Sequence, residues 1–202
     1  VLFRSNYVEP IKEDDLMKGP LEETNEGYSL AKICGIKLCN YLSSTSENRN
    51  YFSVMPCNLF GNNDNFNTET SHVIPALLRK FHRAKQNNNE DVVVWGSGNA
   101  KREFMHVDDL AEACIHLMHS NASKSIINVG TSTDIKISEL VNHIVKITDF
   151  RGKVIYDINK KEGTMRKVLN TDIIRSLGWS PKREFESEIR KMYTQAVKKG
   201  IL

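Results

Sequence analysis

Tyr28 and Lys32 stand four residues apart in the stretch EGYSLAK (26–32). Residues at positions i and i+4 lie on one face of a helix, so the phenol and the ammonium can act together. An ammonium beside a phenol stabilises the phenolate, and Tyr28 could then exchange a proton with a substrate oxygen near neutral pH. Most Tyr-x-x-x-Lys pairs are only a turn of a surface helix. The spacing therefore indicates an acid/base pair that other segments must support.

The elements that would position this pair alternate along the chain. Thr24 or Asn25 can cap a helix running to about Ser43. Asp108 and Ser138 are expected to open two further helices, and Leu2-Phe3 reads as the end of a strand. Strands are predicted at 51–55, 91–95, 103–107, 126–130 and 153–156, and helices at 72–84, 108–119, 137–148, 172–177 and 184–199. This alternation predicts the α/β class with a partly parallel sheet.

Composition excludes several classes of protein. The chain has 202 residues, is 40% hydrophobic and 26% charged, and has no apolar run long enough to cross a membrane. Its first residues, VLFRS, do not show the layout of a signal peptide, so none is expected in them. A net charge of +3 is too small to suggest a nucleic-acid surface.

The four cysteines form no Cys-x-x-Cys pair and no zinc-site spacing, so reduced cytosolic thiols and no metal are expected. Cys34 and Cys114 fall in apolar helical patterns and are predicted to be core residues.

One expected feature is missing. No Gly-x-Gly-x-x-Gly turn follows a strand, and the Gly96–Gly98 segment is too late in the chain and precedes no helix. A dinucleotide-binding fold needs such a turn to bring the pyrophosphate onto a helix N-terminus. We therefore expect the sequence to begin in mid-fold, without an N-terminal half.

The Tyr28–Lys32 stretch is the first of five motifs whose order along the chain is informative. After YSLAK come VMPCNLFG (54–61), SHVIPALLRKF (71–81), VVVWGSG (92–98) and REFMHVDD (102–109). This order resembles the extended short-chain dehydrogenase/reductase family, the NAD-dependent nucleotide-sugar epimerases and dehydratases. Asn65-Phe66, with the SHVIP and VVVWGSG stretches, is similar to the branch that makes GDP-L-fucose from GDP-4-keto-6-deoxy-D-mannose. The resemblance covers the chain from about Glu13 to the last helix.

The resemblance implies a fold and a domain division. It predicts the C-terminal part of a Rossmann-like NAD(P)-binding fold joined to a smaller α/β substrate-binding lobe. Residues 1–70 would be the remnant of the dinucleotide-binding domain. Residues 71–202 would form mainly the sugar-nucleotide lobe, with segments around 103–120 returning to the first domain. Family members typically pair through the tyrosine helix, so a cytoplasmic homodimer is expected.

It also implies an activity, which is NADPH-dependent epimerisation at two ring carbons followed by reduction of the ketone. Tyr28 matches the tyrosine that protonates the C4 oxygen, and Lys32 matches the lysine that holds the nicotinamide ribose. His72 matches an acid of the epimerisation step. The competing interpretation of His72 is a histidine that caps a helix or lies on the surface.

The family's second acid is a cysteine two residues after a catalytic serine. Counting back from Tyr28 puts that cysteine at about Val1 and the serine before the chain begins. None of the four cysteines can take this role, and Cys57 stands where the family usually has threonine. The chain alone is therefore expected to be poorly active, and its preference for NADPH over NADH cannot be read from these residues.

The resemblance assigns the remaining site residues. The cofactor site would include Tyr28, Lys32, Pro56, Cys57, Asn58, Leu59 and His72. The GDP-sugar site would include Asn58, Lys80, Trp95, Arg102 and Lys167. Three of these assignments have a plainer interpretation: a turn for 56–59, a core tryptophan for Trp95, and a solvated charge run for 166–167. The aspartates of REFMHVDD are expected to be structural, and His82, His106, His116, His119 and His143 have no predicted partner.

Two other functions remain open at this point. One is another nucleotide-sugar enzyme of the same class, a 4-epimerase or a 4,6-dehydratase. The other is a non-catalytic module that binds sugar nucleotides. Retention of Tyr28, Lys32 and His72 together argues for catalysis, and the SHVIP stretch argues for the GDP-L-fucose branch.

Overall fold

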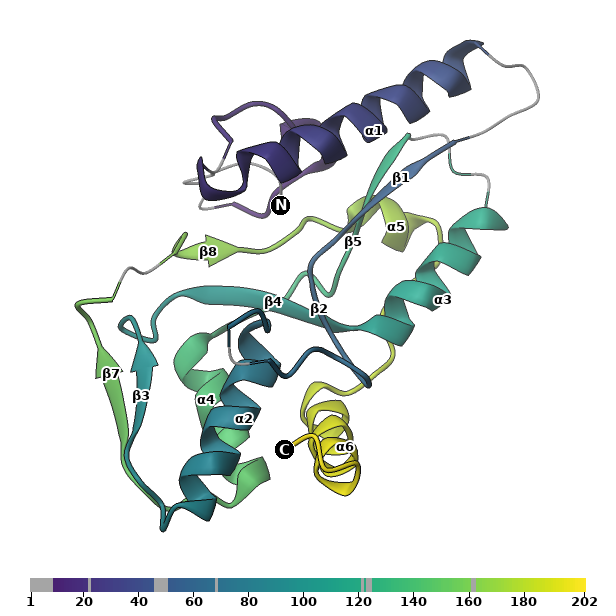
Figure 1. The fold of residues 1–202 in the computed structure, drawn as a ribbon. Coiled ribbons are helices and arrows are strands. Elements are labelled where there is room, and N and C mark those ends of the chain that lie inside the picture. The colour runs from purple at the N-terminus through teal and green to yellow at the C-terminus, as the bar shows by residue number, and fades with distance from the viewer. Residues whose placement is uncertain are drawn as a thin grey trace.

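The computed structural model describes residues 9–21, 23–45, 51–67, 69–120, 122, 125–160 and 163–202. The central element is β4 (Lys101–His106), which pairs in parallel with β2 (Asn58–Phe60) and β8 (Arg166–Lys167) and antiparallel with β6 (Asp134–Lys136). Figure 1 shows α2 (Val73–Gln86), α4 (Ile137–Thr148) and α6 (Phe185–Lys198) on one side of β4, and α1 (Glu26–Thr45) on the other. The expected strand end at Leu2-Phe3 lies outside the described residues.

Two parallel strands, β1 (Ser53–Pro56) and β5 (Ile126–Val129), form a separate pair near α1. Both are apolar segments, as strands of a parallel sheet usually are. They share a core with α3 (Val107–Met118) and α5 (Asp172–Ser176). The fully buried members include Ala113, Ile127, Val129 and Ile174. This core holds the strand that leads into the 56–59 segment.

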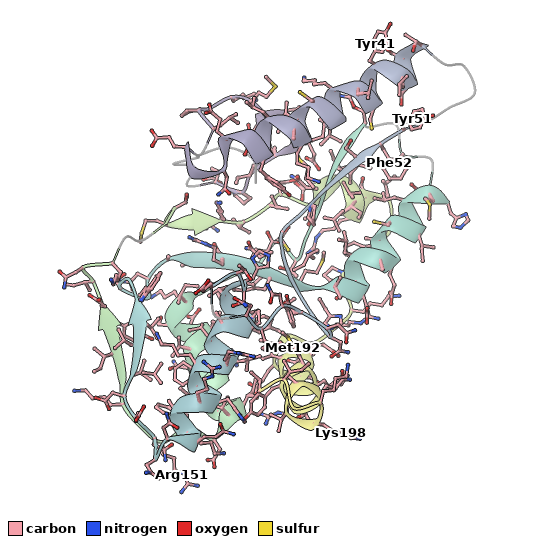
Figure 2. All side chains as sticks on the ribbon, in the orientation of Figure 1. Tyr41, Tyr51, Phe52, Arg151, Met192 and Lys198 are labelled. Carbon is pink, nitrogen blue, oxygen red and sulfur yellow. The ribbon has the colours of Figure 1, made fainter. Side chains whose placement is uncertain are left out.

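A second core lies between α2, α4 and α6 and also covers the parallel pair β3 (Val92–Trp95) and β7 (Val154–Asp157). Apolar residues recur at helical spacing on all three helices, which predicts such a shared core. Phe81 on α2 is completely buried and meets the Phe150 ring edge to face, with centroids 5.1 Å apart. Met192 of α6 faces the same core (Figure 2).

A glycine turn connects β3 to β4. Gly96 and Gly98 have φ values of 81° and 76°, the left-handed region that favours glycine. A Cβ on Gly98 would lie 2.6 Å from the Tyr156 ring, so any side chain there would also clash. The turn leads into a strand, which confirms that it is not a phosphate-binding turn at a helix N-terminus.

The tyrosine helix α1 begins at Glu26, after a 3₁₀ turn at Glu23–Asn25. Its buried positions are Ser29, Ile33 and Ile36, a narrow stripe. Cys34 is exposed, so the prediction that it is a core residue is wrong, because it lies beside this stripe and not on it. Tyr41 projects from the far end of α1, away from the sheet (Figure 2).

Two predicted helix caps are also wrong. The helix expected to start at Asp108 begins at Val107, and the cap is His106, whose Nδ1 accepts from the Asp108 main-chain N–H at 3.2 Å. The helix expected to open with Ser138 is instead capped at Lys136. In both cases the preceding strand runs directly into the helix, so the cap lies at the strand end.

The predicted 103–107 strand is longer than expected, and β2, β6, β8 and the 3₁₀ turn Glu13–Asp15 were not predicted.

Four of the histidines without a predicted partner have one. His82 meets the Tyr193 hydroxyl at 2.8 Å, His116 the Leu177 carbonyl at 2.8 Å, and His143 the Glu186 carboxylate at 3.0 Å. The fourth is His106, the cap of α3.

Glu186 joins α4 to α6 and makes the fold sensitive to acid. Hydrogen bonds from Lys146, His143 and Arg190 lower the pKa of Glu186 from 4.5 to about 2. A lowered folded-state pKa stabilises the fold above the unfolded value of 4.5, and that contribution is lost as the pH falls toward about 2. We expect Glu186→Gln to flatten the decrease in Tm between about pH 5 and about pH 3. Thermal unfolding followed by circular dichroism measures this, with Glu69→Gln, an exposed change, as the control.

Within the described residues, no helix is long and apolar enough to cross a membrane. In the same part of the chain, no cluster of three His, Cys, Asp or Glu side chains could hold a metal ion.

Candidate active site

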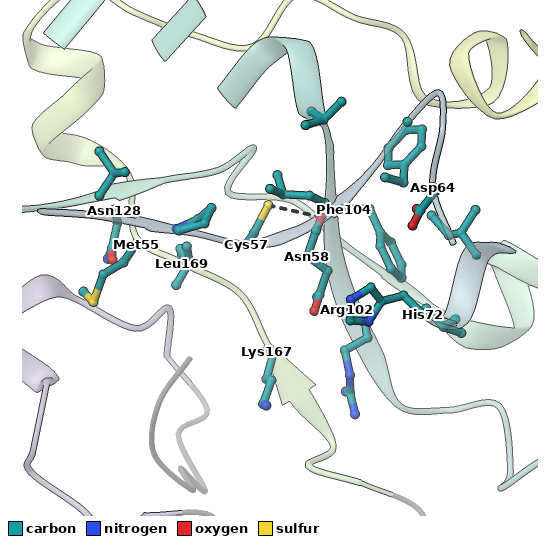
Figure 3. A pocket seen from close by; sticks show the side chains of 18 of the residues that line it. Met55, Cys57, Asn58, Asp64, His72, Arg102, Phe104, Asn128, Lys167 and Leu169 are labelled. Carbon is teal, nitrogen blue, oxygen red and sulfur yellow. Dashed lines mark hydrogen bonds between the residues drawn. The ribbon is translucent and has the colours of Figure 1, made fainter. Parts of the chain in front are cut away.

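A cavity of about 1290 Å³ lies between α1 and the segments β1, β2, β4 and β8. It brings together residues that are far apart in the sequence, on different elements (Figure 3). The predicted site residues that line it are Tyr28, Lys32, Pro56, Cys57, Asn58, Leu59, His72, Arg102 and Lys167.

Tyr28 and Lys32 occupy the α1 wall of this cavity. Ser29, immediately after Tyr28, belongs to the buried stripe of α1, so the pair stands at the edge of that stripe. Lys32 Nζ lies 5.4 Å from the centre of the Tyr28 ring. Tyr28 is 61% exposed, so its hydroxyl is accessible to a ligand. The pair therefore has the proximity that an acid/base role requires.

The 56–59 segment forms the opposite wall, where the chain passes from the β1–β5 pair to the β2–β4 pair. The main-chain N–H of Cys57 donates to the Val129 carbonyl at 3.0 Å, and Asn58 Nδ2 donates to the Glu103 carbonyl at 2.8 Å. Both contacts fix the backbone of the segment. The interpretation of 56–59 as an ordinary strand-ending turn is wrong, because strand pairing resumes at Asn58.

Burial strongly raises the pKa of the Cys57 thiol, and the nearby Glu103 charge raises it further. Cys57 thus stays protonated, whereas Cys34 is exposed on α1. We expect iodoacetamide at mildly alkaline pH to modify Cys57 at least about tenfold more slowly than Cys34, since the thiolate is the reacting form. Peptide mapping by mass spectrometry gives the two rates. Equal rates in a chain with native circular dichroism would contradict the raised pKa of the Cys57 thiol.

His72 directly precedes α2 and is exposed on the cavity side. His72 occupies the cap position and is exposed, as the competing interpretation of a capping or surface histidine expects, although among the described residues its side chain makes no capping hydrogen bond to α2. The imidazole is available to a ligand in the cavity.

Arg102 and Lys167 are partners in the parallel pairing of β4 and β8. Side chains at paired positions of neighbouring strands project to the same face, and both line the cavity. The Arg102 guanidinium donates to the Thr164 carbonyl at 2.5 Å and to the Lys101 carbonyl at 2.7 Å. Two cations side by side suit a diphosphate.

The neighbouring Arg166 is not a solvated charge, as the plainer interpretation of 166–167 would have it. Its Nε donates to the Asp134 carboxylate at 2.5 Å. That ion pair attaches β8 to β6 across β4 and supports the position of Lys167.

Lys80 and Trp95 are not among the described residues that line the cavity. The Lys80 ammonium donates a hydrogen bond to the Val93 carbonyl and so joins α2 to β3. Trp95 is 69% exposed, so the interpretation of it as a core residue is wrong. It lies on the outer face of β3, with Lys160 Nζ 5.7 Å from its ring.

Three residues that sequence reasoning did not select support the cavity walls. The buried Asn128 donates from Nδ2 to the carbonyls of Ile11 and Asn170, at 2.9 and 3.0 Å. Its main-chain N–H donates to Glu13 at 2.9 Å. Glu103 is buried on β4. For Asn128 and Glu103 the available signal was a polar residue inside an otherwise apolar strand.

Comparison with known proteins places the chain in a family. Residues 5–130 match the model of the NAD dependent epimerase/dehydratase family. The chain belongs to that family. It is 46% identical over 194 residues to the GDP-L-fucose synthase of Escherichia coli strain K12, a match that covers 92% of this chain and 60% of that protein. It is 43% identical to GDP-L-fucose synthase 1 of Arabidopsis thaliana, covering 92% of this chain and 57% of that one.

A solved structure of a GDP-L-fucose synthetase from Naegleria fowleri bound to NADP matches with a TM-score of 0.90 at 29% identity. The match covers 98% of this chain and 64% of that one. The chain thus spans less than two thirds of the relatives named here. The predicted α/β class with a Rossmann-like part and the predicted family are confirmed.

Proposed function

We propose that the protein carrying this chain converts GDP-4-keto-6-deoxy-D-mannose to GDP-L-fucose by epimerisation and NADPH-dependent reduction. One observation carries the proposal: a single cavity is lined by the Tyr28–Lys32 pair, His72 and the two cations Arg102 and Lys167. Relatives at 43–46% identity that bear the name GDP-L-fucose synthase support it.

The cavity walls fit the nicotinamide end of NADP(H). Pro56 and Leu59 offer apolar surface to a flat ring, and Lys32 offers an ammonium to ribose hydroxyls. When bound, the cofactor would supply a hydride to the ketone carbon. Tyr28 would give its proton to the C4 oxygen, and the Lys32 ammonium would stabilise the phenolate left behind. Backbone groups of Cys57 and Asn58 would orient the carboxamide.

His72 would act in the epimerisation step. That step removes a proton from a carbon beside the ketone and returns one on the other face of the ring, so acid/base groups are needed around the sugar. His72 lines the cavity from a different element than Tyr28, which allows the two groups to approach different parts of one sugar. The second acid of this step is not assigned to any of the four cysteines.

Arg102 and Lys167 would bind the diphosphate, and Asn58 the sugar. We keep Lys80 and Trp95 as proposed contacts for the outer part of the nucleotide. The Trp95 side chain is 69% exposed and can stack on a ring.

The proposal also covers the division into domains, the oligomeric state and the cellular location. Residues 1–70 and about 103–120 would belong to the cofactor domain, since β1, α3 and β5 share one core. The rest would form mainly the sugar-nucleotide lobe around the α2–α4–α6 core, while β5 and α5 pack with β1 and α3. A homodimer through α1 fits its exposed apolar side chains, among them Leu30, Leu38 and Tyr41. A cytosolic location fits four cysteines that are all described and all free thiols.

Calorimetric titration of the 202-residue chain with GDP tests the substrate class. We expect binding that weakens about tenfold to hundredfold in Arg102→Ala, because hydrogen bonds to charged groups contribute about 1.5–3 kcal/mol. Arg190→Ala on α6, an exposed arginine outside the cavity, is the matched control. Undetectable GDP binding, or equal affinity in both variants, would contradict a GDP-sugar site at Arg102.

A further inference from the structure

Glu103 is a carboxylate buried to 1% exposure in the middle of β4, next to Arg102. It accepts the main-chain N–H of Thr131 at 2.6 Å, of Ser132 at 2.8 Å and of Leu169 at 2.7 Å. The Thr131 hydroxyl is a fourth donor at 3.3 Å. Among the described residues, these main-chain and hydroxyl donors are the hydrogen-bond partners of the carboxylate. They offset the cost of its burial, which requires all of them to stay in place.

The segments that Glu103 joins are those that carry the cavity side chains. Leu169 is two residues beyond Lys167, on the chain that continues from β8. Asn58 Nδ2 donates to the Glu103 carbonyl at 2.8 Å, which attaches β2 to the same residue. Alternation along β4 sends Arg102 and Phe104 into the cavity and Glu103 to the other face. Glu103 thus lies directly behind the proposed diphosphate site.

Gly130, directly after β5, shows how closely the chain approaches this carboxylate. A Cβ on Gly130 would lie 2.3 Å from Glu103 Oε1, so only glycine allows the chain to pass at the observed distance. The turn after β5, the chain after β8 and strand β4 therefore meet at one side chain.

We propose that Glu103 is a positioning residue for GDP-sugar binding. By holding the chain after β8 against β4, its carboxylate fixes Arg102 and Lys167 side by side, at the separation a diphosphate needs. The inference rests on the proposed function, because it assigns the two cations to the diphosphate. Glu103 does not line the cavity, so it acts through Arg102 and Lys167.

Glu103→Gln in the 202-residue chain tests this role. The substitution keeps the size of the side chain but turns an amide N–H₂ toward main-chain N–H donors, which leaves at least one of them unpaired. We expect GDP affinity in calorimetric titration to fall by about tenfold to hundredfold. Glu112→Gln, a half-exposed glutamate of α3 that pairs with Arg183 and does not line the cavity, is the matched control and should bind GDP as the unaltered chain does.

A double-mutant cycle separates positioning from a general loss of structure. If Glu103 acts through Arg102, then Glu103→Gln should weaken GDP binding much less in an Arg102→Ala background than in the unaltered chain. A role in overall stability alone predicts that the two losses multiply. If Glu103→Gln does not fold, Thr131→Val removes the hydroxyl that donates to Glu103 and that also bonds the main chain of Thr133. We expect a loss of about two- to tenfold that shrinks in the same way.

The outcomes are distinct. GDP binding by the unaltered chain, weakened by Glu103→Gln with losses that do not multiply, supports the positioning role. Unchanged affinity in a folded Glu103→Gln chain, or losses that multiply, would overturn it while the proposed function stands. Absence of GDP binding by the unaltered chain would overturn the proposed function itself.

Discussion

Replacing Tyr28 by phenylalanine is expected to lower the rate of ketone reduction by about 10²–10⁴-fold, the usual contribution of a general acid. The variant keeps the ring next to Lys32 but has no proton to give to the C4 oxygen. Because ring packing is retained, we expect KM for the GDP-sugar to change little and kcat to carry the loss. The assay uses a chimera in which the N-terminal segment of the Escherichia coli relative precedes this chain, and it follows oxidation of NADPH.

Tyr41→Phe is the control for this prediction. It removes a hydroxyl from the same helix at a side chain that is 64% exposed and outside the cavity. The Tyr41→Phe chimera should reduce the substrate at the unaltered rate. A Tyr28→Phe chimera with more than about a third of the unaltered kcat would show that another group supplies the proton, since general-acid removal is normally far larger.

Phe81→Ala is expected to lower the free energy of unfolding by about 3–5 kcal/mol. Phe81 is completely buried at the centre of the α2–α4–α6 core, and its ring packs edge to face on Phe150. Truncation removes the burial of a large aromatic ring and leaves a cavity that close-packed helices cannot fill. Denaturant unfolding followed by circular dichroism measures the change as a shift of the midpoint.

Ile158→Ala is the matched control, since this side chain is 76% exposed and the change should stay within about 0.5 kcal/mol. A Phe81→Ala loss below about 1 kcal/mol would mean that the helices close over the missing ring or that the core is loosely packed.

Some features of the fold could be predicted from the sequence. Long periodic segments such as 137–148, with Leu140, Val141 and Ile144 on one face, predicted α4 closely. The two- and three-residue strands β6 and β8 could not be predicted, because so few residues show no periodicity and their pairing depends on β4. Cys34 and Asp108 were misplaced because their environment depends on the width of a buried stripe and on where a strand ends.

The residues of the candidate site also divide into those that the sequence predicts and those that it does not. Tyr28, Lys32 and His72 were predicted from motifs that resemble a family, and they line one cavity. Glu103 and Asn128 escaped prediction because their partners are distant in the sequence: Glu103 bonds Leu169, and Asn128 bonds Glu13 and Ile11. Trp95 was expected to contact the ligand, and its position on the outer face of β3 follows from strand alternation, since its neighbour Val94 is buried.

We infer that this chain supplies the acid/base residues and the sugar-nucleotide site of a GDP-L-fucose-forming enzyme. The most direct test of this inference is incubation of the chimera with GDP-4-keto-6-deoxy-D-mannose and NADPH, with identification of the product by chromatography and mass spectrometry. We expect GDP-L-fucose as the product, loss of reduction in Tyr28→Phe, and reduction without epimerisation in His72→Gln. A folded chimera that binds GDP but neither oxidises NADPH nor alters the sugar would contradict it, and would indicate a protein that only binds sugar nucleotides.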